Sequence, residues 1–136
     1  MSAEYTIKNL SLKEITIKFG IELNFALLAG NAPDRYYYFP KKTIEDKKLA
    51  STGIVEKVTE LGLVDEWQKL DINLKLNNPA TIWRFPIETV SQSDAGFERV
   101  YQSSVVVPNW VLHLAPKQVW QVSITQTYTV TQTVSL

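Results

Sequence analysis

Apolar and polar residues alternate along three stretches of the chain. The longest covers residues 15–27, where every odd position is apolar, and shorter examples cover residues 70–76 and 120–124. A period of two places successive side chains on opposite faces of a strand, so each stretch predicts a strand with one buried face. At roughly 3.3 Å per residue the first strand would be about 43 Å long, which predicts a bend or bulge. Gly20 is the natural position for it.

Turn-forming residues separate these stretches at short intervals. Glycine, proline, asparagine, aspartate and serine cluster at residues 9–11, 30–34, 51–53, 61–62, 77–79, 93–96, 108–109 and 116–117. Short strands divided by such turns are typical of an all-β antiparallel sandwich or barrel. The one helix candidate, residues 41–50, is short and mostly charged, so we expect a connection with at most one or two helical turns. We predict one β-sandwich domain over residues 1–136, with residues 125–136 either extending the final strand or fraying.

Composition narrows the classes of function. The chain has 136 residues, 14 basic and 14 acidic side chains and no cysteine. Proteins that bind nucleic acid usually carry a cluster of basic residues for its phosphates. This chain has a net charge of zero and no such cluster, so no nucleic-acid partner is expected. No apolar run reaches the length that spans a bilayer and no signal peptide is visible, so the sequence predicts a cytoplasmic protein without a membrane partner. The absence of cysteine excludes a disulfide framework, a thiolate nucleophile and a cysteine-ligated metal.

The titratable residues form no pattern that indicates catalysis. A lone histidine, His113, lies in a strand-like alternation, and we predict neither a metal site nor a cofactor. Glycoside hydrolysis requires two carboxyl groups about 5–9.5 Å apart, and with this many acids some pair at that distance is expected by chance. Asp65 and Glu66 are neighbours, but adjacent residues of a strand point to opposite faces. The sequence therefore predicts no catalytic residue.

Aromatic rings beside planar polar groups can bind a sugar, although a buried core or a solvated turn is the commoner role of such residues. Trp110 and Trp120 share the apolar alternation of their strands and are predicted to be core, whereas Trp67 stands among charged residues and is predicted to be exposed. Two of the three tyrosines at residues 36–38 must share one strand face. Residues 88–99 combine amides, hydroxyls and both charges around a glycine, either as a binding loop or as a plain hairpin. The candidate carbohydrate-binding residues are Trp67, Tyr37, Glu88, Gln92, Asp94 and Arg99.

Three longer segments resemble a known family. They are FGIELNFALLAGNAPDRYYY, VTELGLVDEWQKLDINL and PATIWRFPIETVSQSDAGFERVYQSSVVVPNWVLHLAP, at residues 19–38, 58–74 and 79–116. Together they are similar to the C-terminal β-sandwich domain of the prokaryotic α-amylases and 4-α-glucanotransferases of glycoside hydrolase family 57. The resemblance covers residues 5–124 and corresponds to the later half of that region, which forms a supersandwich related to the galactose mutarotase fold.

The resemblance implies a non-catalytic accessory domain, because in that family the catalytic carboxylates lie on a preceding (β/α) barrel. The expected partners are an α-glucan and a catalytic glycosidase domain. A half-sandwich without its other sheet would expose an apolar face, so a homodimer is also expected. The alternative is a purely structural or oligomerisation sandwich with no ligand. A third alternative is that the chain is itself a glycosidase, but no arrangement of residues in the sequence indicates a glycosidase active site.

Overall fold

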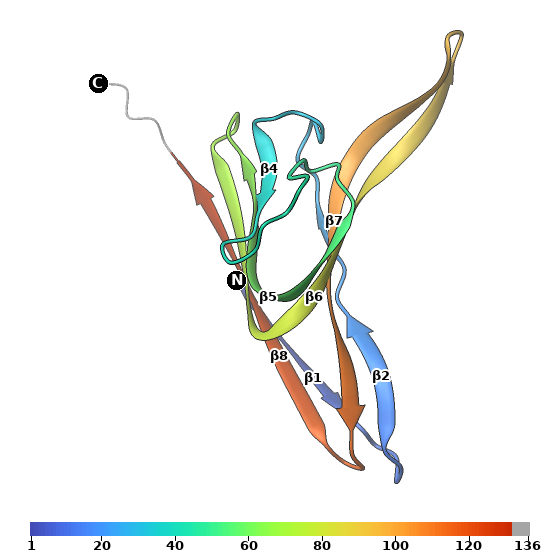
Figure 1. Ribbon diagram of the computed structural model, residues 1–136, viewed down its shortest axis with the longest axis vertical. Coiled ribbons are helices and arrows are strands. Elements are labelled where there is room, and N and C mark those ends of the chain that lie inside the picture. Colours follow the sequence, from blue (N-terminus) through green and yellow to red (C-terminus); the bar gives the residue numbers. More distant parts are fainter. Residues whose placement is uncertain (132–136) are drawn as a thin grey trace.

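The structure, a computed structural model, describes residues 1–131, and these form an antiparallel all-β fold (Figure 1). The strands are β1 (Ser2–Lys8), β2 (Ile15–Gly20), β3 (Leu23–Phe25), β4 (Arg35–Tyr38), β5 (Gly53–Asp65), β6 (Leu70–Ser93), β7 (Gly96–Leu114) and β8 (Val119–Val130). The expected β-sandwich class is confirmed. Within residues 1–131 no helix has the length and hydrophobicity needed to cross a membrane.

The strands form one hydrogen-bonded sheet that folds over itself into two layers. The first layer has the order β1-β8-β6-β5-β4 and uses the first part of β6. The second layer contains the rest of β6, which pairs with β7, and β7 pairs in turn with β2 and β3. The first part of β5 follows β6 into this second layer. Both long strands therefore belong to both layers, as in sandwiches whose strands switch sheets at a bend.

The bend of β6 replaces a turn that the sequence predicted at residues 77–79. The side-chain oxygen of Asn77 accepts a hydrogen bond from the backbone N–H of Ser123 at 2.8 Å, and the Asn78 amide donates to the Gln121 carbonyl at 2.8 Å. These side-chain bonds connect β6 to β8 beyond the last regular backbone pair, Leu76 with Ile124. The Asn-Asn-Pro signal marks a change of layer inside a strand, and the prediction of a chain reversal there was wrong.

The predicted strand over residues 15–27 is present as β2 and β3, with the break at the expected glycine. Gly20 pairs with Asn109 and Leu23 pairs with Val106, so the register is the same on both sides of the break and no residue is inserted. The interruption lies opposite Pro108, which has no N–H to donate and accepts from Ile21 N–H at 3.0 Å. The cause of the break is therefore on the partner strand as well as at the glycine.

Residues 41–50 form an irregular loop, and the expected helical turns are absent. Ile44 and Leu49 are both buried in the core. Their spacing of five residues places them on different sides of a helix, so a helix could not bury both. Near the C-terminus, β8 continues to Val130, so residues 125–130 of the threonine-rich segment belong to the final strand. Residues 132–136 lie outside the described part of the chain.

An aromatic cluster joins the two layers at the end where β1 and β8 face β2 and β7. The rings of Phe19 and Trp110 are stacked with centroids 6.1 Å apart, and Trp110 and Trp120 lie 5.2 Å apart. Tyr5 of β1 contacts Phe19 from the opposite layer at 6.0 Å. Trp110 is buried, as the sequence predicts, and Trp120 is partly buried at the edge of the core.

We predict that Trp110→Ala lowers the free energy of unfolding by about 3–5 kcal/mol, because it opens a cavity in this cluster. Trp67→Ala is the matched control, since Trp67 is 76% exposed and its loss should change stability by less than about 0.5 kcal/mol. Urea denaturation of both variants measures the difference. Equal losses in the two variants would contradict the assignment of Trp110 to the core.

Candidate functional site

The structure divides the sequence-predicted site residues among three places. Trp67 is exposed on the turn between β5 and β6, and Tyr37 is inside the sandwich. Glu88, Gln92, Asp94 and Arg99 lie on the hairpin of β6 and β7, which projects away from the two layers (Figure 1). These residues do not converge on one site.

The structure buries Tyr37, which the sequence had placed among the candidate carbohydrate-binding residues, since its side chain is 0% exposed. It pairs with Leu63 on the buried face of β4, while Tyr36 and Tyr38 occupy the opposite face. The guanidinium of Arg84 lies over the Tyr37 ring at 5.4 Å, and the Tyr37 hydroxyl has no hydrogen-bond partner among residues 1–131. Burial raises the pKa of Tyr37 to about 12. The Tyr37 side chain therefore does not reach the surface. The expectation that two of the three tyrosines share a face is confirmed.

Tyr36 and Tyr38 instead belong to a polar cluster on the outer face of the first layer. We call this cluster the tyrosine face and define it by Tyr36, Tyr38, Glu60, Glu66, Asp71 and Asn73. The Tyr38 hydroxyl donates to Asp71 Oδ1 at 2.9 Å and accepts from Asn73 Nδ2 at 2.9 Å. The same Asn73 amide donates to Glu60 Oε1 at 2.9 Å. The network fixes the polar groups in place, and within residues 1–131 one oxygen of each carboxylate accepts no hydrogen bond.

The backbone of β5 makes room for one of these tyrosines. A Cβ atom at Gly62 would lie 2.2 Å from the Tyr38 ring, so only glycine permits the ring to pack directly on the strand. Tyr38 is nevertheless partly exposed, and so is Tyr36, whose hydroxyl donates to Glu66 Oε1 at 3.1 Å. Burial, followed by the hydrogen bond to Glu66, raises the pKa of Tyr36 above its ordinary value of 10.

A shallow pocket of about 400 Å³ opens beside this face. It is lined by Pro33, Tyr36, Tyr37, Tyr38 and Lys47. Such a volume lies in the range of small-molecule sites. Tyr36 and Tyr38 are partly exposed and Tyr37 is buried, and the feature that distinguishes them is the buried Leu63 that pairs with Tyr37.

The turn that carries Trp67 is anchored to the same layer by a buried ion pair. Asp65 is 0% exposed and accepts from Arg35 Nε at 3.2 Å and from the Gln68 N–H at 3.0 Å. Glu66, the next residue, accepts instead from the hydroxyl of Tyr36 on the outer face. The two acids point to opposite sides, as the sequence predicts. Trp67 is thus held at the end of the tyrosine face.

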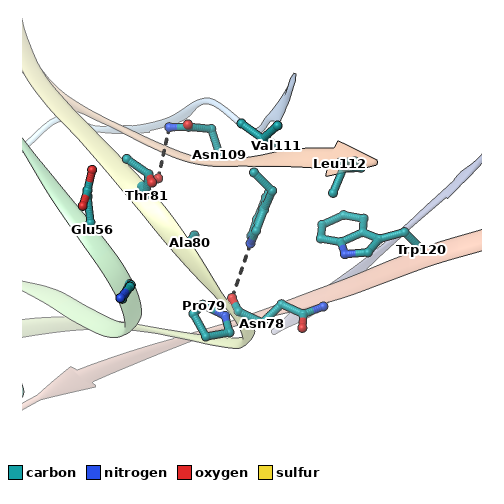
Figure 2. Close-up of a pocket in the computed structure, with 11 residues that line it drawn as sticks. Glu56, Asn78, Pro79, Ala80, Thr81, Asn109, Val111, Leu112 and Trp120 are labelled. Carbon is teal, nitrogen blue, oxygen red and sulfur yellow. Dashed lines mark hydrogen bonds between the residues drawn. The ribbon is translucent and has the colours of Figure 1, made fainter. Parts of the chain in front are cut away.

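A second pocket, of about 430 Å³, opens where β6 leaves β7 (Figure 2). Its polar groups include Asn78 and Asn109, which the sequence marked only as parts of turn signals at residues 77–79 and 108–109 and not as site residues. Asn109 Nδ2 donates to the Thr81 carbonyl at 3.0 Å, and Trp110 Nε1 donates to the Asn78 carbonyl at 3.4 Å (Figure 2). These bonds close the bend, and the indole of Trp110 packs against Phe19 and Trp120. We therefore assign this pocket to the structure of the bend.

The four predicted residues on the β6–β7 hairpin are all exposed. Arg99 Nη1 lies 3.9 Å from Glu88 Oε2, an exposed ion pair of small energetic value. Gly96 follows the two-residue turn at Asp94 and Ala95 and has φ of 114°, a conformation that favours glycine. Residues 88–99 form a hairpin, and a binding role for it stays a prediction.

Comparison with known proteins identifies relatives of the chain. The family described as "Alpha-amylase/4-alpha-glucanotransferase, C-terminal" matches residues 1–124. Alpha-amylase 1 of Dictyoglomus thermophilum is 40% identical over 122 residues, covering 88% of this chain and 17% of that protein. An alpha-amylase of Pyrococcus abyssi is 32% identical over 101 residues, covering 74% of this chain and 12% of that protein. The chain thus spans less than a fifth of the length of these relatives.

The fold also occurs in a solved structure. The crystal structure of 4-alpha-glucanotransferase from Thermococcus litoralis matches 92% of this chain and 16% of that chain with a TM-score of 0.63. At 20% sequence identity this match establishes the shared fold.

We predict that Tyr37→Phe raises the free energy of unfolding by about 1 kcal/mol, because it removes a buried hydroxyl without a partner and keeps the ring. The folded state holds the pKa of Tyr37 near 12, above the ordinary value of 10. Stability linked to this group is therefore present below pH 10 and lost as pH rises toward 12, and Tyr37→Phe should reduce that loss. Urea denaturation at pH 8 and pH 11 measures both effects. Tyr128→Phe, at a half-exposed position of β8, is the control, and identical behaviour of the two variants would refute the prediction.

Proposed function

The chain belongs to the α-amylase/4-α-glucanotransferase C-terminal family, and from this premise we propose that it holds an α-glucan chain on the tyrosine face. It is an accessory domain of that family of enzymes. The observation that supports glucan binding is the arrangement of two partly exposed tyrosine rings beside three carboxylates and an amide on one rigid sheet face. Trp67 adds an exposed indole at the end of that face.

The chemistry of this face fits a sugar. The apolar side of a pyranose packs on an aromatic ring, and its hydroxyls donate to carboxylate oxygens. Tyr36 and Tyr38 are two residues apart on one strand, so their Cα atoms are separated by about 6.6 Å along the strand. The second oxygens of Glu60, Glu66 and Asp71 are acceptors that the network leaves free. An extended glucan along the strand would meet rings and acceptors in succession.

Affinity should be low, since the face is open and its polar groups are already hydrogen-bonded to one another. A dissociation constant near 1 mM corresponds to about 4 kcal/mol, which a few aromatic contacts and hydrogen bonds can supply. Weak binding suits a domain that keeps a polymer near an active site on another domain. The competing proposal is a structural or oligomerisation domain without any ligand.

Titration of the chain with maltoheptaose, followed by amide NMR shifts, tests the proposal. We expect saturable shifts on β4, the end of β5 and the start of β6, with a dissociation constant in the millimolar range. Tyr38→Ala and Trp67→Ala should each weaken binding about fivefold to tenfold, which corresponds to about 1–1.4 kcal/mol.

Tyr128→Ala is the matched control, because it removes a half-exposed aromatic ring away from the tyrosine face. It should leave the titration unchanged. If the amide shifts of the folded protein do not change at 20 mM maltoheptaose, the proposal of glucan binding is wrong and the structural role remains. Shifts confined to the β6–β7 hairpin would move the site to Glu88, Gln92, Asp94 and Arg99.

A further inference from the structure

The β6–β7 hairpin extends beyond the sandwich as a two-stranded ribbon (Figure 1). We call residues 87–100 the arm, and every one of them is exposed. The strands pair in register from Glu88 with Tyr101 to Ser93 with Gly96, and no third strand from residues 1–131 joins them. A two-stranded ribbon is only marginally stable by itself in water, so this segment gains most from a surface that covers it.

Both faces of the arm carry large apolar side chains. Val90 and Phe97 share one face and are 63% and 79% exposed. Ile87 and Val100 share the other face and are 40% and 39% exposed. A flat partner would cover only one of these pairs, whereas a groove would cover both.

The charge of the arm also indicates which kind of partner surface it would bind. The arm contains three acidic residues, Glu88, Asp94 and Glu98, and one basic residue, Arg99. The arm is therefore acidic, although the whole chain has no net charge. Two arms from two copies would bring like charges together, which disfavours a second copy of this chain. A groove with apolar walls and a rim of lysine or arginine complements the arm in both shape and charge.

We propose that the arm docks into such a groove on the catalytic part of an amylase-type enzyme. The inference rests on the family assignment and is independent of the glucan site. The relatives supply a partner of the necessary size, because the matched region is 17% of one of them and 12% of the other. Docking places the sandwich at a fixed position on that part of the enzyme.

Hydrogen exchange measured by mass spectrometry tests the proposal. In an antiparallel ribbon only part of the amides bond across the strands, and the others exchange quickly unless they are covered. We compare the arm of this chain in isolation with the aligned hairpin of intact Alpha-amylase 1 from Dictyoglomus thermophilum. The outward amides should exchange at least tenfold more slowly in the intact enzyme. Equal rates in the two proteins would overturn docking.

A chimera in which this chain replaces the matched region of that amylase tests the side chains. The double substitution Val90→Ser and Phe97→Ser should restore fast exchange of the arm, while Tyr128→Ser should not. Protection that survives the double substitution would show that the apolar pair is not the contact. If the chimera does not assemble, the intact relative with serine at its two aligned positions gives the same reading.

Sedimentation of this chain alone separates the proposal from self-association. The unsubstituted chain and the double variant should have the same mass at 100 µM. A dimer that dissociates on the double substitution would overturn the inference and assign the arm to a homodimer instead.

Discussion

The fold depends on the backbone groups of β6 being satisfied where that strand passes from one layer to the other. A buried backbone amide or carbonyl without a partner costs about as much as a lost hydrogen bond, and a bend removes several ladder bonds at once. Here the side chains of Asn77 and Asn78 bond to β8 and that of Asn109 bonds to β6. Pro79 removes one donor from the bend altogether. The two layers, the aromatic cluster between them and the paths of β7 and β8 all follow from this junction.

The core also contains the charged side chain of Arg84. Arg84 is 5% exposed, and no carboxylate of residues 1–131 lies within ion-pair distance of it. Its guanidinium donates to the Ser51 hydroxyl, lies over the ring of Tyr37 and occupies the space that Gly53 leaves by having no side chain. Burial lowers the pKa of Arg84. These contacts tie the end of the loop before β5 to the second layer.

The alternation of apolar and polar residues was enough to predict strands and buried side chains. It could not predict features that depend on contacts between distant parts of the chain. The period of two placed β2, β3 and the buried Trp110 correctly, and flanking charges placed Trp67 outside. It also showed that Tyr37 opposes Tyr36 and Tyr38, but choosing which face is buried requires knowing that Leu63 is the neighbour across the sheet. The Asn-Asn-Pro segment has the composition of a turn, and only its bonds to β8 make it a bend within a strand. The tyrosine face brings β4, β5 and β6 together, so no local pattern could assemble it.

One strand connects the two surfaces for which we propose functions. Asp71 and Asn73 of the tyrosine face lie near the start of β6, and Val90 of the arm lies near its end. The first part of β6 is hydrogen-bonded on both sides, residues 81–93 pair with β7, and the side chains of Asn77 and Asn78 fix the bend between these two parts. If the arm is held by one domain, β6 therefore fixes the distance and direction at which a glucan is presented. A rigid spacer of this kind raises the local concentration of substrate without any catalytic group of its own, because its contribution is geometric.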